Sequence, residues 1–284
     1  MDETGHLKGL SPRDFNRLSS FIYDQCGIKL PPVKRTMIES RLRKRLRILG
    51  MASFSEYCDI VITAKGNEME LVTMIDLVTT NKTDFFREPE HFTYLTENVL
   101  PEWCDATGPR RSVPFSLWSA GCSTGEEPYT LAMVFSEFAS CMPGFTFEIT
   151  ATDISTRVLD TARTAIYAKE RIAPVPMALR RKYLLRSRNP EQEVVRIVPE
   201  LRQRVTFSRL NFMDRSFDIP KNLDVIFCRN VIIYFDRPTQ ECLINKFCDC
   251  LKPGGYLFMG HSETLNGLDV PLFSVYPTVY RRPA

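Results

Sequence analysis

A glycine turn between two apolar patterns carries the residues best placed to bind a ligand. Three residues separate Gly121 from Gly125, and two acids, Glu126 and Glu127, follow directly. The apolar run 115–120 before the turn predicts a strand, and the residues after it have helical spacing. In an open α/β sheet such a turn lies at the carboxyl end of a strand, where ligands bind against the amides of the next helix.

The spacing of the turn narrows the class of ligand. A dinucleotide fingerprint is G-x-G-x-x-G, whereas here three residues separate the glycines. The carboxylates of Glu126 and Glu127 would repel a phosphate and would suit a ligand with a cationic amine, such as S-adenosylmethionine. Judged from these residues alone, a turn that only joins a strand to a helix is an equally good interpretation.

Other strands of the predicted sheet also end in polar residues. Apolar runs alternate with helical patterns after residue 114, which favours a parallel sheet. These strands cover about 145–152, 205–210 and 223–228, and the residues that follow them are Asp153, Asn211, Arg229 and Asn230. Because the carboxyl ends of neighbouring parallel strands form one crevice, we expect these side chains to converge on the glycine turn.

Asp153 has two interpretations. It is placed to accept hydrogen bonds from a ribose diol, as an acid at the tip of the second strand. Alone, it could equally cap the helix that Ser155 begins. The glycine turn at the end of the preceding strand favours the ribose interpretation.

The first part of the chain has helical patterns only, over about 11–26, 33–49, 53–63 and 68–78, and predicts a small bundle. The second helix carries seven lysines and arginines against the single acid Glu39, and Lys34, Arg41 and Arg45 project from one face. Because solvated helix faces normally mix both signs, this pattern favours docking of an acidic protein surface or a nucleic acid.

A polar segment, 79–89, follows the bundle. We expect Phe85 and Phe86 to pin the bundle to the next domain, and Asn81, Thr83 and Arg87 to face a ligand.

The remaining patterns complete an α/β fold. A small antiparallel insertion is predicted over about 174–204, a helix over 238–251, a turn at 252–255, and strands over 256–259 and 273–280. We divide the chain into an N-terminal helical recognition domain, 1–80, and a ligand-binding domain, 81–284.

Composition excludes several classes of protein. The chain has 284 residues, 44% of them hydrophobic and 25% charged, with no signal peptide or membrane-span pattern. Nine scattered cysteines and three histidines predict reduced thiols in the cytoplasm and no metal site. A net charge of +3 is well below that of a dedicated nucleic-acid binder.

Motifs for hydrolysis are missing, because the sequence has neither a G-x-S-x-G elbow nor a P-loop. Methyl transfer is compatible with a sequence that lacks these motifs. Attack on a sulfonium methyl needs alignment and exclusion of water, and a carboxylate acceptor is already ionised, so that no general base is required.

Five motifs together resemble the chemotaxis receptor methyltransferases, the CheR family. They extend over most of the chain, and they are 79–88 (TTNKTDFFRE), 119–129 (SAGCSTGEEPY), 227–235 (FCRNVIIYF), 251–255 (LKPGG) and 260–263 (GHSE). The resemblance implies a Rossmann-like methyltransferase sheet with an N-terminal helical bundle and a small antiparallel β-insertion. It also implies transfer of methyl from S-adenosylmethionine to glutamate carboxylates on the cytoplasmic methylation helices of chemoreceptors, with S-adenosylhomocysteine as the second product.

The resemblance also implies roles for individual residues. The residues expected to contact the cofactor are Asn81, Thr83, Arg87, Gly121, Glu127, Asp153, Asn211, Phe212, Arg229 and Asn230. Glu127 would bind the methionyl ammonium, and Asp153 would bind the ribose. Arg87 and Tyr234 would lie beside the transferring methyl and orient the acceptor. The basic helix, with Arg41, Lys44, Arg45 and Arg47, would bind the acidic receptor helix.

One feature departs from the family pattern. Members that dock on a receptor's C-terminal pentapeptide have glycines in the loop that corresponds to 186–193, and this chain has none there. The sequence therefore does not predict whether the insertion binds a pentapeptide.

Two alternatives stay open: a nucleic-acid methyltransferase of the same fold, and a non-catalytic sensor of S-adenosylmethionine. We rank both below the receptor methyltransferase, and we expect a monomer with no nucleic-acid partner and no insertion in the membrane.

Overall fold

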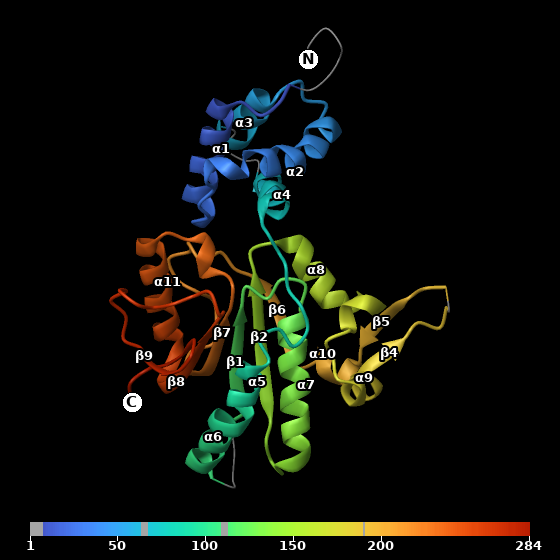
Figure 1. Cartoon of the computed structure of the whole chain (residues 1–284), viewed down its shortest axis with the longest axis vertical. Coiled ribbons are helices and arrows are strands. Elements are labelled where there is room, and N and C mark those ends of the chain that lie inside the picture. Colours follow the sequence, from blue (N-terminus) through green and yellow to red (C-terminus); the bar gives the residue numbers. More distant parts are fainter. Residues whose placement is uncertain (1–7, 64–67, 109–112, 190) are drawn as a thin grey trace.

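The computed structural model describes residues 8–63, 68–108, 113–189 and 191–284, and it has two main parts (Figure 1). A helical unit, built from the N-terminal helices, lies at one end of a larger α/β unit. The helices of the helical unit are α1 (Pro12–Cys26), the 3-10 turn η1 (Pro32–Lys34), α2 (Arg35–Ile48), α3 (Phe54–Thr63) and α4 (Glu68–Val78).

Local signals fix these helices where the sequence predicts them. The Ser11 hydroxyl caps α1 by accepting the Asp14 N–H at 3.1 Å, and Gly27 ends the helix in the left-handed region, with φ 72°. Apolar residues on α1 and α2, among them Leu18, Ile22 and Leu42, are fully buried in a core that belongs to this unit. The predicted bundle is therefore confirmed.

The α/β unit is organised around a seven-stranded sheet with the strand order β6-β2-β1-β7-β8-β10-β9. The strands are β1 (Phe115–Ala120), β2 (Phe147–Asp153), β6 (Val205–Arg209), β7 (Leu223–Cys228), β8 (Leu251–Met259), β9 (Phe273–Tyr276) and β10 (Val279–Arg281). The first five strands in this order run parallel, and β10 and β9 add antiparallel pairs at one edge. The predicted α/β fold is confirmed.

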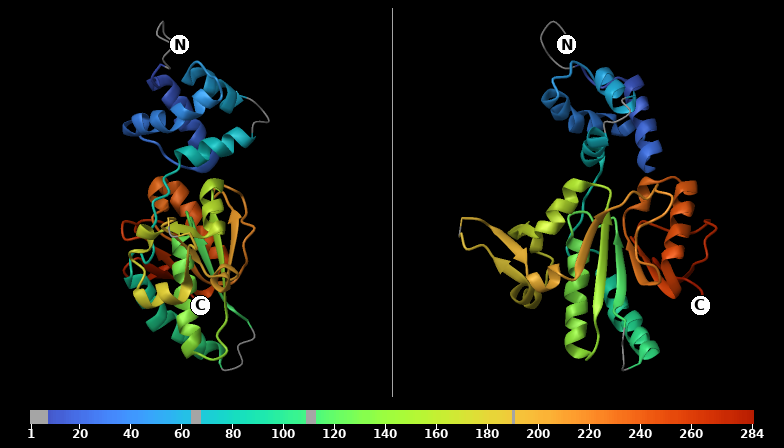
Figure 2. Two further views of the ribbon diagram at one scale, coloured as in Figure 1. Left: turned by 90° about the vertical axis from the view of Figure 1, so that its right-hand side faces the viewer. Right: turned by 180° about the vertical axis from the view of Figure 1, so that it is seen from behind.

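Helices cover both faces of the sheet (Figure 2). The α/β unit contains α5 (Glu90–Tyr94), the π-turn η2 (Leu95–Val99), α6 (Leu100–Thr107), α7 (Glu126–Cys141), α8 (Thr156–Thr164) and α11 (Arg237–Cys250). Alternate residues of a strand point to opposite faces, so Leu117 joins the core beneath α7, whereas Trp118 packs with Phe247 of α11. The central strands are consequently buried on both sides.

Two local predictions are wrong, and one helical segment was not predicted. Residues 252–255, expected as a turn, lie within β8, although the pairing of β8 with β7 is irregular there. The expected strand 273–280 is two strands, because the chain reverses near Thr278, which has φ 59°. The helical segment 90–107 is not among the predicted elements, although Phe92, Leu95 and Trp103 bury one face of it.

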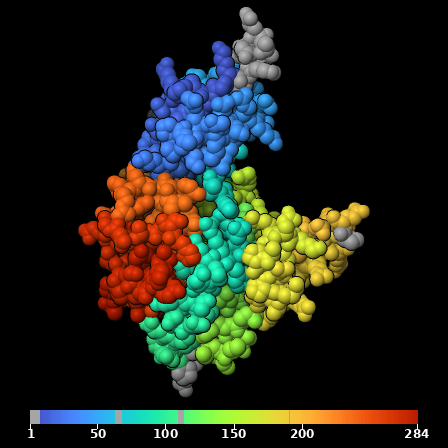
Figure 3. Space-filling model, in the orientation of Figure 1, coloured from blue at the N-terminus to red at the C-terminus, as the bar shows by residue number. Residues whose placement is uncertain are grey.

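The insertion forms a separate three-stranded antiparallel sheet, which projects from the side of the molecule (Figure 3). It contains β3 (Ile166–Ala168), β4 (Leu184–Arg186) and β5 (Val194–Ile197), together with the short helices η3 (Lys169–Ile172), α9 (Met177–Tyr183) and α10 (Pro199–Arg202). The antiparallel insertion is confirmed. It begins earlier than 174 because β3, which directly follows α8, pairs with the central strand β5.

The helical unit docks where the parallel strands end. The Tyr23 hydroxyl, in the last turn of α1, donates to Asp236 at 2.7 Å, and just beyond the helix the Lys29 N–H donates to the Tyr234 carbonyl at 2.9 Å. On the other side, Thr156 of α8 donates to Asp76 of α4 at 2.7 Å. These contacts place the helical unit over the carboxyl ends of the strands, which is the edge where we expect the site.

Candidate active site

Both glycines of the turn have a left-handed backbone conformation. Gly121 and Gly125 have φ of 81° and 95°, in the region that favours glycine. A Cβ on Gly121 would lie 2.6 Å from a methyl carbon of Val231, and one on Gly125 would lie 2.9 Å from the Tyr167 hydroxyl oxygen. Both glycines are therefore required by backbone conformation and by close packing.

Asp153 joins the second strand to this turn. Its carboxylate accepts the Ser123 N–H at 2.8 Å and the Ser155 N–H at 2.9 Å, one on each oxygen. Burial raises the pKa of Asp153, and the backbone hydrogen bonds oppose that rise. Each oxygen can still accept a second hydrogen bond. The carboxyl thus accepts a backbone N–H at the start of α8 and also lines a pocket, so the two interpretations of Asp153 do not exclude each other.

A buried arginine connects the tip of β7 to the elements around it. Arg229 Nε donates to Glu127 Oε2 at 2.7 Å, and its Nη1 donates to the Arg87 carbonyl at 2.6 Å. The guanidinium also lies over the rings of Phe92 and Phe227. Arg229 is only 8% exposed, so its charge depends for compensation on Glu127 and, at a longer distance of 3.5 Å, on Glu88.

The two acids after the glycine turn are both paired. Ser119 Oγ and Arg229 Nε donate to Glu127, and Arg171 Nη2 donates to Glu126 at 2.6 Å. The sequence suggests two carboxylates that would repel a phosphate, but each has an arginine partner from a distant part of the chain. The charge argument from the turn alone is therefore weaker than the sequence indicates.

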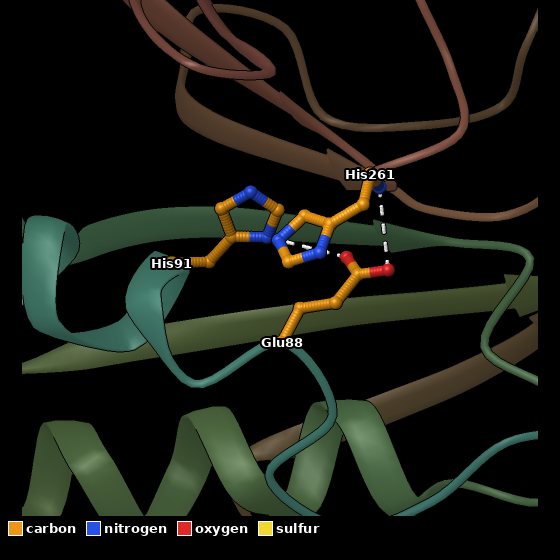
Figure 4. Close-up of side chains that lie close together, drawn as sticks. All are labelled: Glu88, His91 and His261. Atoms are coloured by element: carbon orange, nitrogen blue, oxygen red, sulfur yellow. Dashed lines mark hydrogen bonds and ion pairs between the residues drawn. The ribbon is translucent and has the colours of Figure 1, made fainter.

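Three side chains that could ligate a metal lie together beside this arginine. The carboxylate of Glu88 points toward the His91 ring and toward the backbone of His261 (Figure 4). Burial, followed by the charge of Arg229, lowers the pKa of His91 to about 4, so this histidine is neutral at pH 7. Arg229 Nη1 lies 3.2 Å from His91 Nδ1 and 3.5 Å from Glu88 Oε2, and its charge opposes a metal cation there.

Arg87 and Asn230 meet across the site. Arg87 Nη2 donates to the Asn230 side-chain oxygen at 2.5 Å, and Asn230 Nδ2 donates to Glu88 at 3.2 Å. Phe86, Glu88 and Asn230 all have positive φ, between 53° and 62°. Such conformations cost about 1–3 kcal/mol each and cluster at functional sites, where surrounding contacts hold them.

One pocket collects the predicted ligand residues. All ten predicted cofactor residues line it, together with Tyr234, which completes the 3-10 turn η4 (Ile232–Tyr234). Lys29, Leu30, Lys34 and Met37 of the helical unit also line it. We did not predict that these four residues would reach the pocket, although Lys34 is part of the basic face.

Asn211 and Phe212, which line the pocket, also make contacts within the protein. Asn211 Nδ2 donates to the Gln25 carbonyl at 2.7 Å, and the Phe212 ring packs edge-on against Trp118 and Phe247. These two residues therefore also join the helical unit to the sheet core.

The four cations assigned to substrate binding have different surroundings, and none of them lines the pocket. Arg41 Nη1 donates to the Val78 carbonyl at 2.6 Å, which ends α4. Arg45 is paired with Glu70, a buried acid that also accepts the Tyr57 hydroxyl. Arg45 therefore already has an acidic partner within the helical unit, a pairing that the sequence does not predict. Lys44 and Arg47 are exposed.

Sequence reasoning missed three residues of the site network, namely Glu88, His91 and Glu263. All three fall in or beside the quoted motifs, but their partners among residues 229–232 lie at least 31 residues away in the sequence, and no local pattern indicates which atoms meet.

Comparison with known families agrees with these motifs. Residues 81–279 match the family described as CheR methyltransferase, SAM binding domain, and residues 13–79 match CheR methyltransferase, all-alpha domain. The chain is 40% identical to a chemotaxis protein methyltransferase of Borreliella burgdorferi, covering 95% of this chain and 94% of that protein. It is 39% identical to the enzyme of the same name from Salmonella typhimurium, covering 91% and 86%.

No helix within the described ranges is long and apolar enough to span a membrane.

The buried pair predicts a large effect on stability. Arg229→Leu leaves the Glu127 carboxylate buried without its cation and should lower the free energy of unfolding by about 3–5 kcal/mol, measured by urea denaturation. Arg229→Leu combined with Glu127→Gln should recover part of this loss, because Glu127 then carries no charge, and the recovery is only partial because Glu88 also loses its contact with Arg229. A loss below about 1 kcal/mol in the single variant would contradict our view of the pair.

Proposed function

The chain belongs to the CheR methyltransferase family, and from this premise we propose that it is a protein-glutamate O-methyltransferase. It transfers methyl from S-adenosylmethionine to glutamate side chains of chemoreceptors, which tunes their signalling. The observation that carries the proposal is the convergence of all ten predicted cofactor residues, with Tyr234, on one pocket at the ends of the parallel strands.

The residues of the pocket fit this cofactor. The buried carboxylate of Asp153 has free acceptor capacity for a ribose diol. Gly121 lines the pocket with backbone atoms only, and Ile154 and Leu210 offer apolar surface for a base. Glu127, although paired with Arg229, has lone pairs that can meet the methionyl ammonium.

When bound, S-adenosylmethionine supplies an electrophilic methyl on a sulfonium. This chain's own residues then have to orient the acceptor and exclude water. Arg87 is 33% exposed at its side chain, and its guanidinium can hold the acceptor carboxylate in line with the methyl. Tyr234 lies in the same pocket and is assigned to the same task.

The side chains that line the pocket suit an acceptor that is already ionised. The described residues that line the pocket include no histidine, and His91 is already occupied by Arg229 and Thr278. Lys29, Lys34 and Lys82 line the pocket and attract an anion. A glutamate carboxylate therefore suits the site, because it needs no base to activate it.

We assign recognition of the receptor to the helical domain, 1–80, and catalysis to 81–284. Lys34 lies at the pocket, and Lys44 and Arg47 continue the basic surface along the exposed side of α2. An acidic receptor helix laid along α2 would bring its glutamates toward the pocket. Arg41 and Arg45 support this surface by holding α2 against α4.

The function is tested by methyl transfer to cytoplasmic fragments of chemoreceptors from the same cell. Fragments with their methylatable glutamates should take up labelled methyl that is released by mild base, as expected of a methyl ester. Matched fragments with alanine at those positions should take up none. Equal labelling of both fragments, or none despite measurable cofactor binding by calorimetry, would refute the proposal.

Replacing Asp153 should weaken cofactor binding. Asp153→Ala removes the acceptor proposed for the ribose and should raise the Kd for S-adenosylmethionine about ten- to hundredfold, as measured by calorimetry, since a hydrogen bond to a charged group contributes about 1.5–3 kcal/mol. Asp160→Ala, an exposed acid on α8, is the matched control and should bind normally. Normal binding by Asp153→Ala would remove this residue from the cofactor site.

Charge reversal on α2 should separate recognition from cofactor binding. Lys44→Glu with Arg47→Glu should lower kcat/KM for receptor fragments at least tenfold and leave cofactor affinity unchanged, because neither residue lines the pocket. Arg186→Glu with Arg188→Glu makes the same change in net charge on the insertion and should have little effect. If both pairs behave alike, α2 has no specific role in recognition.

A further inference from the structure

A buried carboxylate that the proposed reaction does not use lies beside the pocket. Glu263 follows β8 and is only 4% exposed. Its Oε1 accepts the N–H groups of Val231 and Ile232, each at 2.8 Å. Its Oε2 accepts those of Asn230 at 2.8 Å and Gly260 at 2.7 Å. One side chain thus satisfies four backbone donors, three of them consecutive.

These donors belong to the loop that carries the proposed site residues. Val231 and Ile232 lead into η4, where the first N–H groups of a helical turn have no partner within the turn. Asn230, in the left-handed region with φ 62°, needs outside contacts to keep that conformation. A carboxylate at this place accepts hydrogen bonds from these N–H groups, and its negative charge is attracted by their partial positive charges.

The loop also determines where the two residues assigned to the methyl group lie. The Asn230 side chain accepts a hydrogen bond from Arg87, and η4 ends at Tyr234. The loop is enclosed from the β8 side as well, because a Cβ on Gly260 would lie 2.4 Å from Asn230 Nδ2. A shift of residues 230–232 would therefore move Arg87 and Tyr234 relative to each other.

We infer that Glu263 is a positioning residue of the methyl-transfer reaction, which fixes loop 230–234 so that Arg87 and Tyr234 face the same point in the pocket. The inference rests on the proposed function. A carboxylate is suited to this task because both of its oxygens accept hydrogen bonds, whereas the amide of a glutamine would turn an NH2 group toward two of the four donors.

The test compares Glu263→Gln with a matched control. Glu241→Gln, on α11, also replaces a carboxylate that accepts a backbone N–H, from Asp269 at 2.9 Å, but it lies away from the pocket lining. We expect Glu263→Gln to lower kcat for receptor fragments at least tenfold with a smaller change in KM, and Glu241→Gln to behave as the wild type. A wild-type kcat in Glu263→Gln would overturn the inference.

A triple variant distinguishes positioning from a general loss of structure. If Glu263 acts through Arg87 and Tyr234, adding Glu263→Gln to Arg87→Ala with Tyr234→Phe should lower the residual kcat less than threefold. A full tenfold loss in that background would show an effect independent of both residues and would refute the positioning role.

Hydrogen exchange on the wild-type protein needs no variant and covers the case in which Glu263→Gln does not fold. The amides of Asn230, Val231 and Ile232 should exchange at least a hundredfold more slowly than that of exposed Ile233. Rapid exchange at 230–232 would overturn the inference. If the wild type fails to transfer methyl although these amides are protected, the proposed reaction is refuted, but the hydrogen bonds from loop 230–232 to Glu263 still stand.

Discussion

The buried guanidinium of Arg229 is the contact on which the site depends. Its planar fork reaches Glu127 at the start of α7 and the Arg87 carbonyl in the segment that follows α4, and both bonds are short. Phe92 and Phe227 lie against its faces, so the group is shielded from water on the remaining sides. Three segments that are distant in the sequence therefore take their relative positions from one side chain that never loses its charge.

This constraint explains why neighbouring groups are arranged as they are. A permanent buried cation requires a carboxylate, which Glu127 supplies. Burial lowers the pKa of His91, and the charge of Arg229 lowers it further, so His91 is neutral. His91 in turn accepts from Arg229 through Nδ1, which leaves Nε2–H to donate to Thr278 in the β9–β10 turn. The pocket edge is thus held by a continuous polar network, and Arg87, at the partly exposed end of that network, is available to an acceptor.

The sequence predicted the parts of this structure that follow from local rules. Asp153 and Gly121 were identifiable because strand tips in a parallel sheet converge, and the helices of the first 80 residues follow from caps and apolar spacing. The pairing of Arg45 with Glu70 was not predicted, because Glu70 lies on another helix and the charge run on α2 does not indicate it. The four bonds of Glu263 are equally hidden, since they join two loops that only the fold brings together. Long-range pairing of charges is the information that a local pattern does not contain.

The central claim is that this pocket holds S-adenosylmethionine with its sulfur toward Arg87 and Tyr234. A crystal structure with S-adenosylhomocysteine tests it most directly. The account predicts ribose hydroxyls within hydrogen-bonding distance of the Asp153 carboxylate, the sulfur facing Arg87 and Tyr234, and the Arg229–Glu127 pair intact. A ligand bound elsewhere, or bound here with its sulfur turned away from Arg87 and Tyr234, would contradict the account.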